Sequence, residues 1–419
     1  MKKQQLIQIR KSEMQGEAIR SRMQWVSEGE KPSKFFCAME HGNYINKTIK
    51  CLKKEDNSYV RNQKEILNEI KCFYSSLFGF QESNLNEHKA WETLRQQKTN
   101  KLTKAAARSM EGYLTTDEVG NALMKTKHNK TPGLDGLPSE FYKVFWKDLK
   151  YPITNAINTS FDKGMLPLTL RQCIITCLPK KGKSRHNIKN WRPLSMLSVV
   201  YKLASAAIAN RIKPFLNDII DSSQCGFVPG RYIGDCTRLV YDIMSYTEQK
   251  QIPGMLVLID FEKAFDSISW PFIYKVLEYL GFSESFIQWV RLFNNNIKAT
   301  VIQCGFLSGF FDIQRGCRQG DPISAILFII AGQILTLLLK QNTDIIGVTV
   351  GNIEIKLTQF ADDTTLILNG TTQSLKSAFN TLEIYGTMSG LKVNTDKTQI
   401  VWIGKKKRCK EKLKSITSA

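Results

Sequence analysis

Met255-Leu256-Val257-Leu258-Ile259-Asp260 is an apolar run that ends on a carboxylate, and Phe360-Ala361-Asp362-Asp363-Thr364 follows about a hundred residues later. The first run has the composition of a buried strand. The second stands between short alternating runs at residues 354–359 and 365–368, so we predict that it forms the turn of a β-hairpin. Magnesium prefers hard oxygen ligands, and enzymes that join nucleotides hold it on a few carboxylates. The three aspartates therefore predict a two-metal phosphoryl-transfer site, and the chain is a candidate polymerase.

The three carboxylates are not equivalent in this interpretation. Asp260 and Asp362 are predicted to bridge both cations, with Asp363 as an adjacent helper. Neighbouring strand residues point to opposite faces, so Asp363 need not face the metal ions. An Asp-Asp pair in a turn also has a purely structural explanation, because aspartate tolerates turn geometry. The pair taken alone leaves both explanations open.

The composition favours a globular protein that binds a polyanion. The chain has 419 residues, and 42% of them are hydrophobic, which is enough to build a sizeable core. Its 59 Lys and Arg residues against 38 Asp and Glu residues give a formal net charge of +21. Such a charge attracts phosphate backbones, so nucleic acid is the expected partner. Binding to a membrane surface, or solubility alone, would explain the charge as well.

Other compositional features narrow the class of protein. Ten cysteines occur without a C-x-x-C pair, and the four histidines do not gather around them, so a structural zinc site is not expected. The N-terminus shows no secretory signal pattern, which predicts an intracellular protein, in the nucleus, the cytoplasm or both. Residues 323–339 form the most apolar stretch, and they are predicted to be a buried core helix and not a membrane span.

Local patterns divide the chain into successive units. Residues 1–110 are basic and mostly helical in pattern, and Thr115 with Glu118 has the spacing of a capping box that opens a new unit. Ser139 is predicted to cap a helix that contains Phe141 and Trp146. A helix is also predicted to begin at Trp270-Pro271. The remaining predictions are helices at residues 65–77, 199–216 and 235–248, and strands at residues 173–179, 300–303, 309–313 and 401–404.

Several separate motifs occur in one order along the chain. Asp260 is followed five residues later by Phe265, then by the Arg318-Gln319-Gly320 loop and by Phe360-Ala361-Asp362-Asp363. In the order and the residues of these motifs, the chain resembles the reverse transcriptases of non-LTR, LINE-type retrotransposons. The resemblance also includes shorter segments across nearly the whole chain, at residues 21–25, 133–136, 191–195, 226–227, 390–394 and 397–398.

The resemblance implies an α+β fold, that of a right-hand polymerase. Residues 1–110 would be a helical N-terminal extension, residues 111–253 the fingers, and residues 254–400 a palm with a ferredoxin-like antiparallel sheet and helices. Residues 401–419 would end the palm in a basic tail, with the thumb largely absent. The implied partners are an RNA template, a DNA primer and deoxynucleoside triphosphates. The implied cofactor is a pair of Mg²⁺ ions, for which Mn²⁺ is an alternative. No membrane and no protein partner is implied.

The resemblance also assigns roles to individual residues. Asp260, Asp362 and Asp363 match the catalytic, metal-binding aspartates, and Phe265 matches the bulky residue that excludes a 2′-hydroxyl. Lys397 would protonate the departing pyrophosphate as a general acid. The other substrate-binding residues would be the loop residues Gln319 and Gly320 and the basic residues Lys180, Arg192 and Arg231.

Plainer explanations exist for some of these residues. Phe265 would also fit an ordinary core position. Lys180 would fit a solvated hairpin loop, and Lys397 a solvated helix end. The basic tail at residues 405–414 is expected by default to be a solvated chain end. The alternatives are contact with primer phosphates or a nuclear localisation signal.

Three functional hypotheses follow. The first is an RNA-directed DNA polymerase domain of a non-LTR retrotransposon, truncated relative to family members that carry an endonuclease and a thumb. The second is a catalytically inactive remnant that still binds nucleic acid. The third is a reverse transcriptase of the group II intron maturase kind, whose palm motifs are similar.

Overall fold

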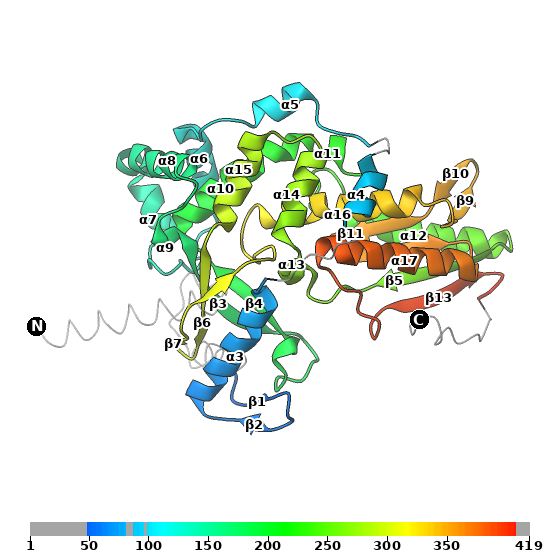
Figure 1. The fold of residues 1–419 in the computed structure, drawn as a ribbon, viewed down its shortest axis with the longest axis horizontal. Helices are drawn as coiled ribbons and strands as arrows, with labels where there is room; N and C mark the ends of the chain where they lie inside the picture. Colours follow the sequence, from blue (N-terminus) through cyan, green and yellow to red (C-terminus); the bar gives the residue numbers. More distant parts are fainter. Residues whose placement is uncertain (1–47, 81–86, 96–98, 408–419) are drawn as a thin grey trace, which may run out of the picture.

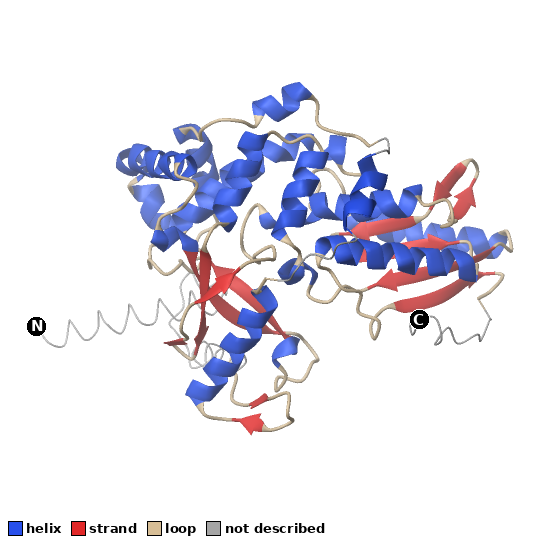
Figure 2. Ribbon diagram, viewed as in Figure 1, coloured by secondary structure: helices blue, strands red, loops and turns tan. Residues whose placement is uncertain are grey.

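The computed structural model describes residues 48–80, 87–95 and 99–407. Two β-sheets, one of four strands and one of five, lie on either side of a central group of helices (Figures 1 and 2). The motif at residues 21–25 and most of the basic tail are outside the described residues, as is the first part of the predicted helical extension. Buried side chains from both sheets and from the helices form one continuous core.

The four-stranded sheet contains the apolar run and the hairpin. Its order is β11 (Leu357–Phe360), β12 (Asp363–Leu368), β5 (Pro253–Ile259) and β13 (Gln399–Gly404), and each neighbouring pair is antiparallel. The predicted strand and hairpin are confirmed, with one change. Residues 353–359 do not form one strand, because Lys356 separates β10 (Ile353–Ile355) from β11, and β10 pairs with β9 (Val348–Val350) instead.

The two faces of this sheet have different partners. Met255, Val257 and Ile259 point into the main core, which includes α14 (Trp270–Tyr279), α16 (Ser324–Gln341) and α17 (Thr372–Ser389). Leu256 alternates to the other face and packs with side chains of α12 (Ile233–Gln249). Leu258, which shares that face and lies nearer to Asp260, is 41% exposed. The face is therefore covered at one end and open at the end that carries the carboxylates.

The five-stranded sheet joins distant parts of the sequence. Its order is β4 (Trp191–Met196), β3 (Gln172–Pro179), β6 (Ile297–Gln303) and β7 (Phe306–Leu307), and β8 (Phe311–Ile313) pairs with β6. Strands β3 and β6 are parallel, whereas β3 and β4 form an antiparallel hairpin. Helix α3 (Gln63–Phe78), which the sequence predicted at residues 65–77, packs beside β6 and β8. A hairpin of β1 (Leu52–Lys53) and β2 (Tyr59–Val60) lies near the N-terminal end of α3 (Figure 1).

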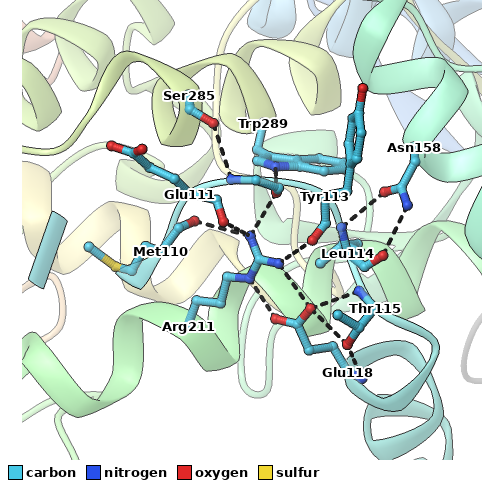
Figure 3. A network of polar contacts seen from close by, with 11 residues as sticks. Met110, Glu111, Tyr113, Leu114, Thr115, Glu118, Asn158, Arg211, Ser285 and Trp289 are labelled. Carbon is cyan, nitrogen blue, oxygen red and sulfur yellow. Dashed lines mark hydrogen bonds and ion pairs between the residues drawn. The ribbon is translucent and has the colours of Figure 1, made fainter. Parts of the chain in front are cut away.

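A polar network around Arg211 holds the helical layer together (Figure 3). Arg211 lies on α10 (Val199–Ile212), and its Nε and Nη2 donate to both carboxylate oxygens of Glu118 at 2.6 and 2.9 Å. Glu118 also completes the predicted capping box with Thr115 at the start of α6 (Thr116–Met124), which is confirmed. Arg211 also donates to four consecutive backbone carbonyls, those of Met110, Glu111, Gly112 and Tyr113. One guanidinium thereby fixes the segment that leads into α6.

Two helix predictions need correction. Ser139 is the first residue of α7 (Ser139–Val144) and not its cap; the cap position is Pro138, which has no hydroxyl to donate or accept. The aromatic run is divided, because α7 ends before Phe145 and α8 (Trp146–Asp162) begins at Trp146. The helix predicted at residues 199–216 ends as an α-helix at Ile212, since Pro214 follows within a short 3₁₀ turn (Lys213–Phe215).

Helix α16 answers the membrane question raised by its composition. Among the described residues it is the one helix long and apolar enough to cross a membrane, but 72% of its 18-residue window is buried inside the protein. The prediction of a buried core helix is confirmed. The other described elements are α4 (Glu87–Arg95), α5 (Lys104–Ser109), α9 (Leu168–Arg171), a 3₁₀ turn (Ile188–Asn190), α11 (Leu216–Ile219), α13 (Ala264–Ser267) and α15 (Glu284–Asn294).

Candidate active site

The strand register brings the aspartates together. Ile259 pairs with Thr364 across β5 and β12, so the next position along each strand holds Asp260 and Asp363 on the same face. Asp362 lies in the hairpin turn directly before Asp363, and Phe360 and Asp363 form the last pair of the hairpin. The doubt about Asp363 is thereby answered, because it shares a face with Asp260. The residue in the turn, and not on a strand, is Asp362.

The three carboxylates lie within electrostatic range of one another. Burial raises the pKa of Asp362, and the negative charges of Asp363 and Asp260 raise it further, while Arg192 opposes them. Burial also raises the pKa of Asp363, with Asp260 adding to the effect. Asp362 and Asp363 are therefore harder to ionise because of burial and the negative charges near them. Carboxylate oxygens are hard donors, which suit a divalent cation.

Lys397 lies against Asp260. Its Nζ donates to Asp260 Oδ2 at 2.8 Å, and the backbone N–H of Asn394 donates to Asp260 O at 2.7 Å. The side chains of Lys397 and Asp260 are 53% and 37% exposed, so the ion pair is weak and readily displaced. Within the described ranges, no three carboxylate, imidazole or thiol groups already converge as metal ligands. A cation would have to compete with Lys397 for Asp260.

Two basic residues of the five-stranded sheet face these carboxylates. Lys180 follows β3, and Arg192 lies on the exposed face of β4. Partial burial lowers the pKa of Lys180, the positive charges of Lys397 and Arg192 lower it further, and Asp260 and Asp266 act in the opposite direction. Both residues therefore lie within electrostatic range of the carboxylates, and their predicted contact with substrate phosphates stays a prediction.

The loop that carries Gln319 and Gly320 is held between the two sheets. Gln319 Nε2 donates to Asp266 Oδ1 at 3.1 Å, and its carbonyl accepts from Ser195 N of β4 at 2.9 Å. Gly320 has a φ of +111°, and a Cβ there would lie 2.7 Å from Ser195 O. Only glycine fits this approach. Gln319 thereby contacts α13, which carries Phe265, and Gly320 lies against β4.

Comparison with known proteins gives this arrangement a family. Residues 178–412 match the family model described as "Reverse transcriptase (RNA-dependent DNA polymerase)". The chain belongs to the reverse transcriptase family. It is 30% identical to the "Transposon TX1 uncharacterized 149 kDa protein" of Xenopus laevis, over 95% of this chain and 30% of that protein. The resemblance to reverse transcriptases of non-LTR retrotransposons is confirmed.

Two other relatives carry names that state a retroelement origin. The "Retrovirus-related Pol polyprotein from type-2 retrotransposable element R2DM" of Drosophila melanogaster is 28% identical over 66% of this chain and 25% of that protein. The "RNA-directed DNA polymerase from mobile element jockey" of Drosophila funebris is 24% identical over 68% of this chain and 31% of that protein. The chain spans about a quarter to a third of the length of these curated relatives.

Phe265 lies in an aromatic cluster. Its ring stacks on Phe328 with centroids 4.2 Å apart, and the ring of Phe227 meets it edge-on at 6.4 Å. Phe227 is 51% exposed and has a φ of +59°, a conformation that bulky residues rarely adopt. Sequence reasoning did not single out Phe227 as a site residue, because neither its backbone conformation nor its neighbour 38 positions away can be read from local pattern.

A buried polar network supports the loop that carries Gln319 and Gly320. Tyr201 Oη donates to Asp321 Oδ2 at 2.8 Å, and Ser205 donates to the other carboxylate oxygen. Arg318 donates to Tyr201 Oη and, at 2.9 Å, to the carbonyl of Phe293. These residues come from α10, α15 and the loop, so buried hydrogen bonds join the loop to both helices, while Nη1 of Arg318 is buried without a partner.

Arg231, which was predicted to contact substrate, binds backbone carbonyls close to it in the sequence. Its guanidinium donates to the carbonyls of Asp221, Gln224 and Ile220, the last two at 2.7 and 2.8 Å, and to Asn217 Oδ1 at 3.2 Å. Each of its three nitrogens thus has a partner between Asn217 and Gln224, and these contacts use four of its five N–H groups. Arg231 therefore holds the backbone around Gln224, and its contact with substrate stays a prediction.

Asp266 and Lys263 are buried charges that the sequence did not reveal as site residues. Asp266 is 3% exposed, and burial raises its pKa to about 6 despite the nearby Lys263. Burial lowers the pKa of Lys263 to about 8, and its Nζ lies 4.4 Å from the ring centroid of Phe73. Neither residue was among the predicted site residues.

The raised pKa of Asp266 predicts a pH-dependent stability. The folded-state pKa of about 6 lies above the ordinary 3.8, so folding takes up a proton between those values and the wild type loses stability as the pH rises from about 4 to about 6. Asp266→Asn keeps an acceptor for Gln319 but does not titrate. Between pH 4 and pH 7 its stability relative to the wild type should improve by about 2 kcal/mol. Urea unfolding across this pH range measures the difference; parallel curves for the two proteins would contradict the prediction.

Proposed function

We propose that the chain is the RNA-directed DNA polymerase domain of a non-LTR retrotransposon, which adds deoxynucleotides to the 3′-hydroxyl of a DNA primer on an RNA template. The observation that carries the proposal is the meeting of Asp260, Asp362 and Asp363 opposite Lys180 and Arg192. In this assignment residues 111–253 are the fingers and residues 254–400 the palm, which is built on the four-stranded sheet. Strands β6, β7 and β8 of the palm range pair with β3 of the fingers in the five-stranded sheet. The protein would act inside the cell, in the nucleus, the cytoplasm or both.

Each residue of the site has a proposed part in the reaction. Asp260 and Asp362, with Asp363 beside them, would hold two Mg²⁺ ions, or Mn²⁺ in their place. Bound there, the cations would activate the primer hydroxyl and neutralise charge on the triphosphate. Lys180 and Arg192 would neutralise the remaining phosphate charge. Gln319 and Gly320 would lie against the template and the incoming nucleotide. Lys397 Nζ, released from Asp260, would give its proton to the departing pyrophosphate.

Primer extension on an RNA template tests the proposal. The full chain is incubated with an annealed DNA primer, deoxynucleoside triphosphates and Mg²⁺, and it is compared with Asp362→Ala. Extension by the wild type and not by the variant supports the polymerase. Absence of extension by both proteins, with RNA binding retained, supports the inactive remnant. The pairing of Asp260 with Lys397 in place of a converged ligand set is the observation that keeps this second function in view.

Phe265 offers a test of the predicted sugar selection. Replacing it with valine removes a ring that stacks on Phe328 and shortens the side chain beneath the incoming sugar. The ratio of kcat/KM for deoxynucleotides to that for ribonucleotides should fall by on the order of tenfold or more, because the variant leaves room for a 2′-hydroxyl. Phe328→Val, which changes the stacking partner alone, is the matched control. An unchanged ratio in Phe265→Val would assign the residue to core packing.

A further inference from the structure

The hairpin turn that carries Asp362 has an unusual backbone conformation. Ala361, the residue before Asp362, has a φ of +57°, in the left-handed region that favours glycine. A side chain in this region is disfavoured, so the turn needs support from its surroundings to keep this shape. The orientation of the peptide between Ala361 and Asp362 sets the direction of both carboxylates that follow.

Gln224 supplies that support through its side-chain amide. Its Oε1 accepts from Ala361 N at 2.9 Å, and its Nε2 donates to Ala361 O at 3.1 Å. One amide therefore binds the N–H and the C=O of the same left-handed residue. Gln224 is 2% exposed, and Oε1 also accepts from Gly226 N at 2.8 Å. With its donor and its acceptor both used, the amide can adopt this one orientation.

The backbone around Gln224 is fixed to the same hairpin. Cys225 N donates to Gln359 O at 2.8 Å, and Gln359 N donates to Ser223 O at 2.7 Å, so this segment continues the sheet beyond β11. A Cβ at Gly226 would lie 2.4 Å from Ala361 N, which is closer than a side chain can approach. Arg231 binds the carbonyl of Gln224 at 2.7 Å from the other side. The clamp on Ala361 thus rests on a rigid base.

We propose that Gln224 is a positioning residue for the catalytic aspartates, which acts by holding Ala361 in its left-handed conformation. The inference rests on the proposed polymerase function, since it assigns Gln224 a part in the same site. Gln224 has no charge for a cation or a phosphate, and its donor and acceptor are both engaged by backbone groups. Its effect on the reaction therefore passes through the directions of Asp362 and Asp363.

Gln224→Met tests the inference, because methionine has a similar length and is tolerated in buried sites but cannot bind either backbone group. Two readouts are measured on the full chain: Mn²⁺ affinity, from the electron paramagnetic resonance signal of the free ion, and primer-extension kinetics. Loss of groups that orient metal ligands weakens metal binding or activity by about 10- to 100-fold, which is the loss expected for both readouts. The KM for deoxynucleotides should change much less than kcat.

Gln333→Met is the matched control. Gln333 Oε1 accepts from Asp221 N at 3.0 Å, so it anchors the same loop without touching the turn. It should retain Mn²⁺ affinity and kcat within about threefold of the wild type. Ala361→Gly should restore part of the lost activity of Gln224→Met, because glycine adopts the left-handed conformation without a clamp. Should Gln224→Met fail to fold, Gly226→Ala replaces it, since its Cβ forces the segment away from Ala361.

The outcomes separate this inference from the proposed function. Wild-type values in Gln224→Met, or equal losses in Gln333→Met, would overturn the positioning role and leave the polymerase proposal standing. If the wild type does not extend primers but binds Mn²⁺, the polymerase proposal fails while the Mn²⁺ affinities still decide the role of Gln224. A wild type that neither extends primers nor binds Mn²⁺ overturns both.

Discussion

Asp362→Ala is expected to lower primer extension by about a thousandfold or more, because the carboxylate that it removes has no substitute in the site. The neighbouring Asp260 is already paired with Lys397 at 2.8 Å, and Asp363 is the residual acidic group on the hairpin. The folded protein should not lose stability. The pKa of Asp362 is raised by burial and by two like charges, so its removal relieves an unfavourable charge.

The measurement combines single-nucleotide incorporation with thermal unfolding. Asp344→Ala is a suitable control, because Asp344 is an exposed carboxylate in the loop after α16, and this variant should extend primers at the wild-type rate. Extension by Asp362→Ala at a rate similar to that of Asp344→Ala would remove the carboxylate from the mechanism. A large fall in melting temperature for Asp362→Ala would show instead that the turn depends on this side chain.

Arg211→Met is expected to cost about 3 kcal/mol of unfolding free energy. The change leaves the half-buried Glu118 without its partner and four backbone carbonyls, from Met110 to Tyr113, without a donor (Figure 3). Methionine preserves the unbranched stem, so packing changes little. Urea denaturation of the two proteins gives the difference.

Arg238→Met provides the comparison for that loss. Arg238 and Asp242 form an exposed pair on α12, with side chains 79% and 58% accessible, and its removal should cost less than about 0.5 kcal/mol. Similar losses in both variants would mean that the Arg211 network contributes no more than a surface ion pair. Since Arg211 lies far from the carboxylates in the sequence and binds only the helical layer, its variant should retain activity wherever it remains folded.

The sequence predicted the elements whose signals are local. The apolar run before Asp260 and the hairpin around Asp362 follow from strand composition and turn chemistry, and the Thr115 and Glu118 box follows from a fixed spacing. Local signals also misled. Ser139 has the right residue type for a cap, but Pro138 before it already provides the extended backbone at which the helix begins.

The candidate site was predictable in part for a related reason. The aspartates, Lys180 and Arg192 carry charge in recognisable motifs, and the strand register brings Asp260 beside Asp363. Gln224 and Arg231 show the limit. Both are polar residues of one loop. Gln224 binds Ala361, 137 positions away, whereas Arg231 binds carbonyls of its own loop. A contact as distant as that of Gln224 leaves no trace in local spacing.

The parallel pairing of β3 with β6 has a consequence for synthesis on the ribosome. Gln172 pairs with Lys298, so about 125 residues must be translated after Gln172 before its partner exists. During that interval the β3 and β4 hairpin exposes an unpaired strand edge that includes Ile174 and Ile175. Non-local parallel pairing is slow to form, and such intermediates are prone to associate with one another. The nascent chain therefore has a long window in which chaperone binding at this edge would decide the yield of folded protein.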